Sequence, residues 1–205
     1  SRVAQSATCP VVQVESDVIV PLVVVSNKAE YAARTIRPKI HKHLRDYRVN
    51  FKKIPLKTPS LNLHLRGMNL ADIDGILRQL SIDRSVPAVS MFYKGGTSRA
   101  RKIFKNFLKQ HLQHYADHSN QPQTDDISHM SPYLHFGQIS PLYLALQVRS
   151  ADNALQEAKD AYIEELVVRR ELAMNFANYT KNYDAYACIP TWAQKTLTDL
   201  RKDKR

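Results

Sequence analysis

Three residues suited to a binding or catalytic site share one stripe of a predicted helix. Tyr162, Glu165 and Arg169 lie three and four residues apart within residues 153–179, so a regular helix places them on one face. A carboxylate and a guanidinium at this spacing form either an ion pair or the polar lining of a cavity. Arg169 and Arg170 together could also clamp a phosphate through bidentate contacts. The spacing alone leaves these alternatives open.

The segment SHMSPYLHFGQIS, residues 128–140, contains two predicted helix starts. Ser131-Pro132 and Ser140-Pro141 each place a capping hydroxyl directly before a proline, whose fixed φ suits the first helical turn. Gly137 lies between them, where a helix end needs a positive φ. The segment is therefore either a plain connector between helices or a helix N-terminus directed at an anion.

Residues 95–118, GGTSRARKIFKNFLKQHLQHYADH, predict a long amphipathic helix. Its opening glycines have the spacing of neither a P-loop nor a dinucleotide fingerprint. Its basic face is either a solvated surface or a contact for nucleic-acid phosphates. The apolar face comprises Ala100, Ile103, Phe104, Phe107, Leu108, His111, Leu112 and Tyr115, and the basic face comprises Arg99, Arg101, Lys102, Lys105 and Lys109.

The histidines do not suggest a metal centre. His111, His114 and His118 share a helix face, but no acidic or cysteine residue stands beside them at ligand spacing. The sequence also lacks a nucleophile elbow and a Ser/His/Asp order, which argues against a hydrolase. We therefore expect no bound metal.

The composition favours a polyanionic partner. The 205 residues carry a formal net charge of +11, an excess typical of nucleic-acid binding. No apolar run approaches the ~20 residues of a membrane span, and the start SRVAQSATCP has no signal-peptide layout. Cys9 and Cys188 form no disulfide or metal framework. We expect an intracellular, cytoplasmic protein without a membrane span.

The hydrophobic pattern predicts an α/β part followed by an all-α part. Residues 9–26 are apolar and β-branched, which favours one or two buried strands of a parallel sheet. A helix capped by Ser26 or Asn27 should follow and kink or restart at Pro38. Both chain ends interrupt a pattern, as in a piece of a longer protein. The expected buried face of that helix comprises Ala29, Ala33, Ile36, Ile40 and Leu44.

Taken together, four segments resemble the class II cyclobutane pyrimidine dimer DNA photolyases of the photolyase/cryptochrome family. They are EYAARTIRPKI, SHMSPYLHFGQISPLYLAL, EELVVRRELAMNFANYTKNYD and PTWAQKTL. The resemblance implies the C-terminal end of a Rossmann-like antenna domain over residues 1–46 and an interdomain linker over 47–70. It implies the N-terminal part of a helical FAD-binding domain over 71–205.

The resemblance also implies roles for individual residues. The segment that holds the flavin diphosphate and ribityl chain corresponds to Ser128, His129, Met130 and Ser131, although His129-Met130 replace an expected Asn-Leu. By the same resemblance, Tyr115 donates its hydroxyl to a cofactor phosphate. Glu165 is the catalytic carboxylate beside the dimer carbonyls, Tyr162 and Arg169 line the lesion pocket and flavin cavity, and Arg170 joins them as a DNA contact.

The activity implied by the resemblance is light-driven DNA repair. Reduced FAD passes an electron to a pyrimidine dimer flipped out of UV-damaged DNA, and the dimer splits. The full-length protein is expected to act as a monomer, with an antenna chromophore as an option in a preceding part, and the fragment alone is expected to be inactive. Two alternatives are a cryptochrome-like flavin photoreceptor without repair and a non-enzymatic, basic helical DNA-binding module.

Overall fold

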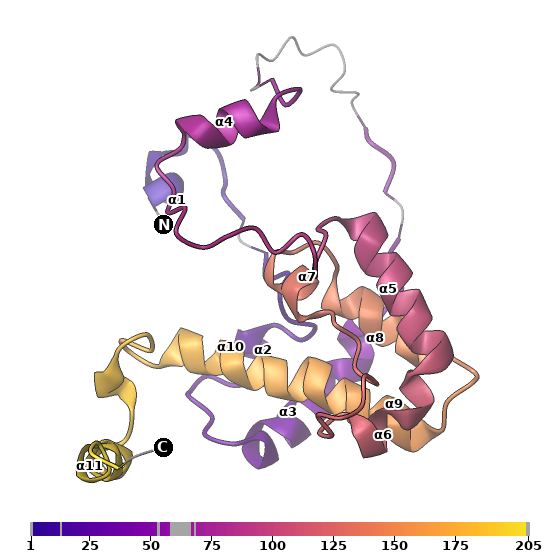
Figure 1. Ribbon diagram of the computed structural model, residues 1–205, viewed down its shortest axis with the longest axis vertical. Coiled ribbons are helices and arrows are strands. Elements are labelled where there is room, and N and C mark those ends of the chain that lie inside the picture. Colours follow the sequence, from indigo (N-terminus) through magenta and orange to yellow (C-terminus); the bar gives the residue numbers. More distant parts are fainter. Residues whose placement is uncertain (1, 13, 53, 58–66, 68, 204–205) are drawn as a thin grey trace. The chain divides into compact units, whose positions relative to one another are not determined.

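The computed structural model describes residues 2–12, 14–52, 54–57, 67 and 69–203. The chain divides into two compact units, Ser1–Val49 with Gly96–Arg205, and Asn50–Gly95 (Figure 1). The larger unit contains α1 (Arg2–Ser6), α2 (Leu22–Val25), α3 (Ala33–Tyr47), α5 (Thr97–Gln110), η1 (Leu112–His114), α6 (Tyr115–His118), α7 (Ser131–His135), α8 (Pro141–Arg149), α9 (Gln156–Ile163), η2 (Glu164–Arg169), α10 (Arg170–Tyr179), η3 (Tyr186–Cys188) and α11 (Thr191–Asp199). The smaller unit contains α4 (Ile73–Gln79).

The strands expected within residues 9–26 are not observed. The described part of the chain contains no β-strand, and the apolar run instead forms the single helical turn α2 after Pro21. Val18, Ile19 and Val20 are buried, as the pattern predicted, but in irregular backbone. The Rossmann-like part of the predicted fold is therefore not supported, whereas the helical part is.

A polar stripe on α10 replaces the hydrogen bonds that a neighbouring strand would have provided. Glu171 Oε1 accepts from the backbone amides of Ile19 (2.9 Å) and Val20 (3.1 Å). Asn175 Oδ1 accepts from the Glu30 amide (2.7 Å), and its Nδ2 donates to a carbonyl of the same stretch. Because buried backbone amides need partners, these side chains fix residues 15–31, the 15–31 segment, against α10.

The helix α3 follows the predicted face but begins later than expected. Ala33, Ile36, Ile40 and Leu44 are buried, as predicted. The residue before the helix is Ala32 rather than Ser26 or Asn27, and the helix continues through Pro38 as one element without restarting. Ser26 instead donates its hydroxyl to Glu30 Oε1, 2.7 Å away.

The amphipathic helix α5 supplies much of the core around the candidate site. Ala100, Phe104 and Phe107 are almost fully buried, and Leu112 and Tyr115 continue the same face through η1 into α6. Gly96 has a φ of 112°, a conformation that favours glycine at the start of this helix. The short α4 in the smaller unit begins with Asp72, whose side chain accepts from the Gly75 amide at 2.8 Å.

The predicted long helix over 153–179 is observed as three consecutive elements. The helices α9 and α10 are joined directly by η2, a π-helical segment, without an intervening loop (Figure 1). A π-helical turn inserted between α-helices is rare and often lies at a functional site. Within the described ranges, no helix combines the length and apolar character needed to cross a bilayer. The domain boundaries expected at residues 46 and 70 stay predictions.

Candidate functional site

A small hollow of about 130 Å³ lies between α6, α7 and the α9–η2 junction. The sequence predicted most of its polar residues, although they come from three separate stretches of the chain. We call it the Tyr115 hollow. It is lined by Tyr115, Ser128, Met130, Ser131, Leu134, Tyr162, Glu165 and Leu166.

Two tyrosines form the aromatic wall of the Tyr115 hollow. The rings of Tyr115 and Tyr162 meet edge to face with centroids 5.1 Å apart, and both contact the ring of Phe107. The Tyr162 hydroxyl donates to Ser128 Oγ at 3.3 Å. Burial raises the pKa of Tyr162, and burial together with the Glu165 carboxylate raises the pKa of Tyr115. Both phenols are therefore neutral hydrogen-bond donors around pH 7.

The structure does not bring Glu165 and Arg169 together in the hollow. Both residues lie in the π-helical segment, so the regular α-helical spacing that would place them on one face does not apply. Glu165 lines the hollow with a side chain that is 57% exposed, so it can meet a ligand from outside. Arg169 is absent from the lining, and its Nε lies closer to Glu164 Oε1 (3.5 Å) than to Glu165 Oε1 (4.0 Å). The predicted ion pair of Arg169 with Glu165 is therefore weaker than the ion pair of Arg169 with Glu164.

Glu164 is held mainly by Arg37 of α3. The Arg37 guanidinium donates through Nε at 2.9 Å and through Nη2 at 2.6 Å. These hydrogen bonds lower the pKa of Glu164 and raise that of Arg37. The bidentate pair joins α3 to the π-helical segment and thereby supports the backbone that carries Glu165.

The Ser128–Ser131 segment reaches the Tyr115 hollow with a sharp turn. His129 has a φ of 54°, in the left-handed region that non-glycine residues adopt infrequently. Its Nε2 lies 2.7 Å from an oxygen of Asp125, and its side chain is not part of the lining. Met130 is almost fully buried and forms part of the floor of the hollow.

The two predicted helix starts differ in the structure. Ser140 caps α8 as predicted, with its hydroxyl accepting from the Tyr143 amide at 3.4 Å. Ser131 is the first residue of α7 and not its cap, since Met130 precedes the helix and no side chain caps it. Because α7 has only five residues and its second residue is Pro132, any anion here would meet hydroxyl groups and little helix dipole. Gly137 has the predicted positive φ, 63°.

Arg170 is engaged away from the hollow. Its Nε donates to the carbonyl of Asp17 at 2.9 Å, and its Nη2 lies 3.7 Å from Asp17 Oδ1. The guanidinium therefore holds the 15–31 segment on α10. Its predicted role as a DNA contact stays a prediction.

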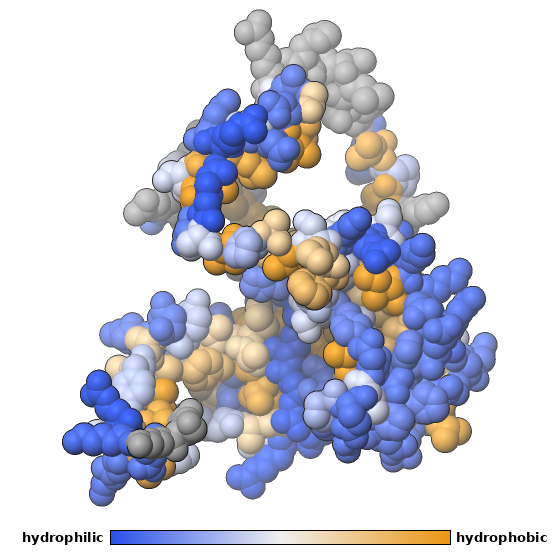
Figure 2. Space-filling view, in the orientation of Figure 1, coloured by the Kyte–Doolittle hydropathy of each residue, from blue (hydrophilic) through white to orange (hydrophobic). Residues whose placement is uncertain are grey.

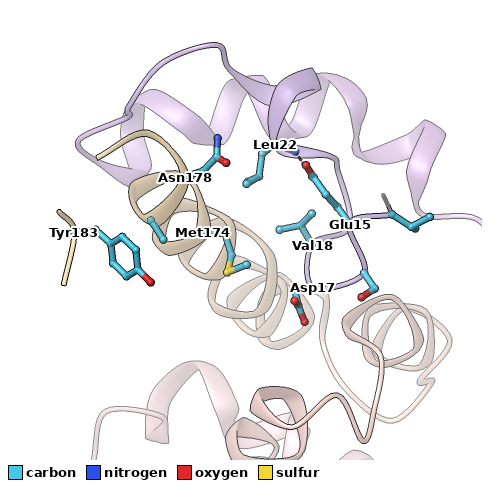
Figure 3. Close-up of a pocket in the computed structure, with 10 residues that line it drawn as sticks. Glu15, Asp17, Val18, Leu22, Met174, Asn178 and Tyr183 are labelled. Carbon is cyan, nitrogen blue, oxygen red and sulfur yellow. Dashed lines mark hydrogen bonds between the residues drawn. The ribbon is translucent and has the colours of Figure 1, made fainter. Parts of the chain in front are cut away.

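A second hollow, of about 340 Å³, lies between the 15–31 segment and α10 (Figure 3). Its carboxylates serve the fold: Glu15 Oε2 accepts from the Leu22 amide at 2.8 Å, and Asp17 faces Arg170. Met174 and Tyr183 complete its wall (Figure 3). None of the predicted site residues lines this hollow, although it is larger than the Tyr115 hollow.

The basic face of α5 is open to solvent. Arg99, Lys102, Lys105 and Lys109 line a shallow groove on this helix, and no ion pair is found for them among the described residues. Figure 2 shows a mainly hydrophilic surface over this part of the molecule. Arg101 lies over the ring of Tyr143, 5.2 Å from its centroid. The face has the charge and exposure that phosphate contacts require.

Sequence reasoning missed an acidic partner of the histidines. Asp126 lies between His111 and His118, with one carboxylate oxygen 2.7 Å and the other 2.5 Å from their Nδ1 atoms. Separations of eight and fifteen residues across a loop have no helical periodicity, so the pattern could not show this contact. Among the described residues, no cluster of three or more histidine, cysteine or acidic side chains is arranged to hold a metal ion.

Sequence reasoning also missed the polar stripe of α10. Glu171, Asn175 and Tyr179 are spaced by four residues, and each bonds the backbone of the 15–31 segment. Burial raises the pKa of Glu171 to about 7, against the opposing effect of its hydrogen bonds from two backbone amides. The four-residue spacing is a signal that could have identified them.

The sequence of this chain resembles those of several known proteins. No family model matches the chain. The chain is 43% identical over 197 residues to a deoxyribodipyrimidine photo-lyase of Methanothermobacter thermautotrophicus, covering 96% of this chain and 42% of that protein. Proteins of the same name from Potorous tridactylus and Arabidopsis thaliana are 38% and 36% identical, over 96% and 94% of this chain and 36% and 40% of their own lengths.

The chain therefore spans about two-fifths of the length of the curated relatives that it matches. Similarity at this level over nearly the whole chain extends through α3, the Tyr115 hollow, η2 and α10. The chain is thus similar over nearly its whole length to part of four proteins named deoxyribodipyrimidine photo-lyase, at 35–43% identity.

Proposed function

We propose that the chain contributes to light-driven repair of cyclobutane pyrimidine dimers in DNA, as in class II photolyases, and that the Tyr115 hollow holds part of an FAD cofactor. The observation that carries the proposal is the convergence of Tyr115, Ser128, Ser131 and Glu165 on one hollow. Three of these side chains offer hydroxyl groups, and one is a carboxylate open to a ligand. The relatives, which are deoxyribodipyrimidine photo-lyases, support the same reaction for the full-length protein.

The residues of the Tyr115 hollow suit one end of a phosphate-bearing aromatic ligand. The hydroxyls of Tyr115, Ser128 and Ser131 can donate to phosphate oxygens, while Met130 and Leu134 offer apolar contacts. The volume of about 130 Å³ lies below the ~300–1,000 Å³ of typical ligand pockets, so the hollow suits only a portion of a dinucleotide. FAD, when bound in its reduced form, supplies the photoexcited electron.

Glu165 is the proposed catalytic carboxylate at the rim. Its exposure leaves it able to contact a flipped pyrimidine dimer, and the bond between Arg37 and Glu164 steadies the backbone beside it. In this role Glu165 positions the dimer carbonyls rather than transferring electrons. The Tyr162 ring, fixed by its bond to Ser128, walls the hollow behind Glu165.

The basic surface suits the proposed DNA substrate. A net charge of +11 and the open cationic face of α5 favour a polyanion. An enzyme that extrudes a base must grip the backbone on either side of the lesion, and a damaged pair costs less to unstack. We propose that the full-length protein acts on UV-damaged DNA inside the cell.

The proposal is tested by light-dependent repair of a dimer-containing oligonucleotide with the full-length protein. Glu165→Ala should lower the yield of repair per absorbed photon several-fold and leave the visible absorption of the bound flavin unchanged. Glu157→Gln, which removes an exposed carboxylate on α9, is the matched control. Absence of repair by the unaltered protein would contradict the proposal and favour a photoreceptor. An unchanged yield in the Glu165 variant would contradict the role of that residue.

A further inference from the structure

The loop between α6 and α7 is fastened to the preceding helices by one carboxylate. Asp126 Oδ1 lies 2.7 Å from Nδ1 of His111, the residue that directly follows the end of α5. Its Oδ2 lies 2.5 Å from Nδ1 of His118, the last residue of α6. Because a carboxylate only accepts hydrogen bonds, both imidazoles donate through Nδ1–H. One side chain thus joins two helix ends, and we call this arrangement the Asp126 clasp.

The surroundings favour the ionised form of this carboxylate. The Asp126 side chain is 17% exposed, so its two hydrogen bonds are partly shielded from water. The hydrogen bond from His118, followed by that from His111, lowers the pKa of Asp126. The ring of His114 stacks on that of His118 with centroids 5.4 Å apart, which limits rotation of one donor.

Two further contacts close the same loop. Thr124 donates its hydroxyl to the carbonyls of His118 (3.1 Å) and Gln121 (2.9 Å). The second contact joins Asp125 Oδ1 to Nε2 of His129, 2.7 Å away. His129 is the residue with a positive φ. The exposed Asp125 pair, with a carboxylate 81% exposed, is weaker than the shielded Asp126 clasp. The clasp is therefore the main anchor of the loop on α5 and α6.

The position of the clasp connects it to the Tyr115 hollow. Asp126 precedes Ser128 by two residues, and Ser128 lines the hollow and accepts from Tyr162. His118 ends the single helical turn that Tyr115 begins. The clasp thus ties the chain that carries Ser128–Ser131 to the turn that carries Tyr115, and both contribute to the lining of the hollow.

We propose that Asp126 is a positioning residue, which through His111 and His118 sets the placement of Ser128–Ser131 against Tyr115. The placement of Ser128–Ser131 does not depend on the function proposed above. The identity of the ligand that the Tyr115 hollow binds does rest on that function. The side chains that face Asp126 are those of His111 and His118, and the ring of His114 stacks on that of His118.

The test is amide hydrogen exchange of the chain without any ligand. The amides of Gln121, Thr124 and Leu134 donate hydrogen bonds within the loop and at the start of α7. Asp126→Asn should speed exchange of these three amides about tenfold or more, as expected for loss of a hydrogen bond to a charged group. Amides of α8 should keep their rates. Asp117→Asn is the matched control, since that exposed carboxylate on α6 lies in the same region and forms no hydrogen bond or ion pair within the described part of the chain. It should change neither set of rates.

A second variant keeps the proposal falsifiable if Asp126→Asn folds poorly. His118→Gln, which leaves His111 in place, should give a smaller increase in the same amides. Unchanged exchange of these amides, or an equal increase throughout the larger unit, would overturn the proposal. Because the readout needs no FAD, a failure of the proposed function would leave this result unaffected.

Discussion

Replacing Glu171 with glutamine tests how the 15–31 segment is held. The Glu171 side chain is almost fully buried, and its Oε1 accepts from the amides of Ile19 and Val20. Its Oε2 is buried and has no hydrogen-bond partner among the residues that the structure describes. Burial accordingly raises its pKa from an ordinary 4.5 to about 7. Glutamine keeps an acceptor for the two amides and removes the cost of burying a charge.

The magnitude follows from proton linkage. The folded state keeps a proton on Glu171 over the range in which the unfolded state has lost it, so stability from this group is full below about pH 4.5. It is lost as the pH rises towards about 7, at about 1.4 kcal/mol per pH unit. The total loss is about 3 kcal/mol. Above that range the contribution of Glu171 no longer changes.

The assay is urea unfolding of the unaltered chain and of Glu171→Gln at several values between about pH 5 and pH 8. We expect the two to be similar near the acidic end and the variant to be more stable by about 2–3 kcal/mol at the basic end. Glu157→Gln is the control for loss of a negative charge at an exposed site. A difference between Glu171→Gln and the unaltered chain that stays constant with pH would refute the reasoning.

Three other perturbations address the packing and the site. Asn175→Ala should lower the free energy of unfolding in urea by about 2–4 kcal/mol, because it leaves the buried Glu30 amide and the Lys28 carbonyl unpaired. The exposed Asn178→Ala should be nearly neutral, and equal effects of the two variants would contradict the role of Asn175 in holding the 15–31 segment. Tyr115→Phe should weaken FAD retention by the full-length protein by about 1 kcal/mol, or about fivefold in affinity, and an unchanged dissociation constant would argue against a phosphate contact. Replacing Lys105 and Lys109 with glutamine should reduce the slope of the logarithm of the DNA-binding constant against the logarithm of the salt concentration by up to about 2. Lys42→Gln on α3 should leave the slope unchanged. An unaltered slope in the Lys105 and Lys109 variant would mean that α5 does not contact phosphate.

The helical packing was largely predictable from the sequence because periodicity reports which face is buried. The buried face of α3 contains the predicted residues except Ala29, which precedes the helix and is only partly buried, and α5 buries Ala100, Phe104 and Phe107 of its predicted face. Ser140 and Gly137 have their predicted local roles. For residues 9–26 the hydrophobic pattern predicted buried strands, and that prediction was wrong for the part that the structure describes. Apolar, β-branched side chains show burial equally well in a strand and in irregular backbone, and the deciding partners, Glu171 and Asn175, are about 150 residues away in sequence.

The candidate site was predictable in its residues but not in its geometry. Tyr115, Ser128, Ser131, Tyr162 and Glu165 meet at one hollow, whereas Arg169 does not line it. A helical stripe assumes regular turns, and the π-helical segment at Glu164–Arg169 breaks that assumption. The Asp126 clasp arises from a loop returning to its own helix, which no fixed spacing encodes.

The central claim is that the Tyr115 hollow accepts part of FAD, and blocking it is the most direct test. Ser131 lies exposed at the rim, so Ser131→Trp fills the hollow without disturbing the core, and Ser98→Trp on the outer surface of α5 is the control. The measurement is the visible absorption of bound flavin per protein after gel filtration of each full-length variant. We predict that Ser131→Trp loses the flavin while Ser98→Trp retains it and both unfold at the temperature of the unaltered protein. Full flavin occupancy in Ser131→Trp would contradict the claim.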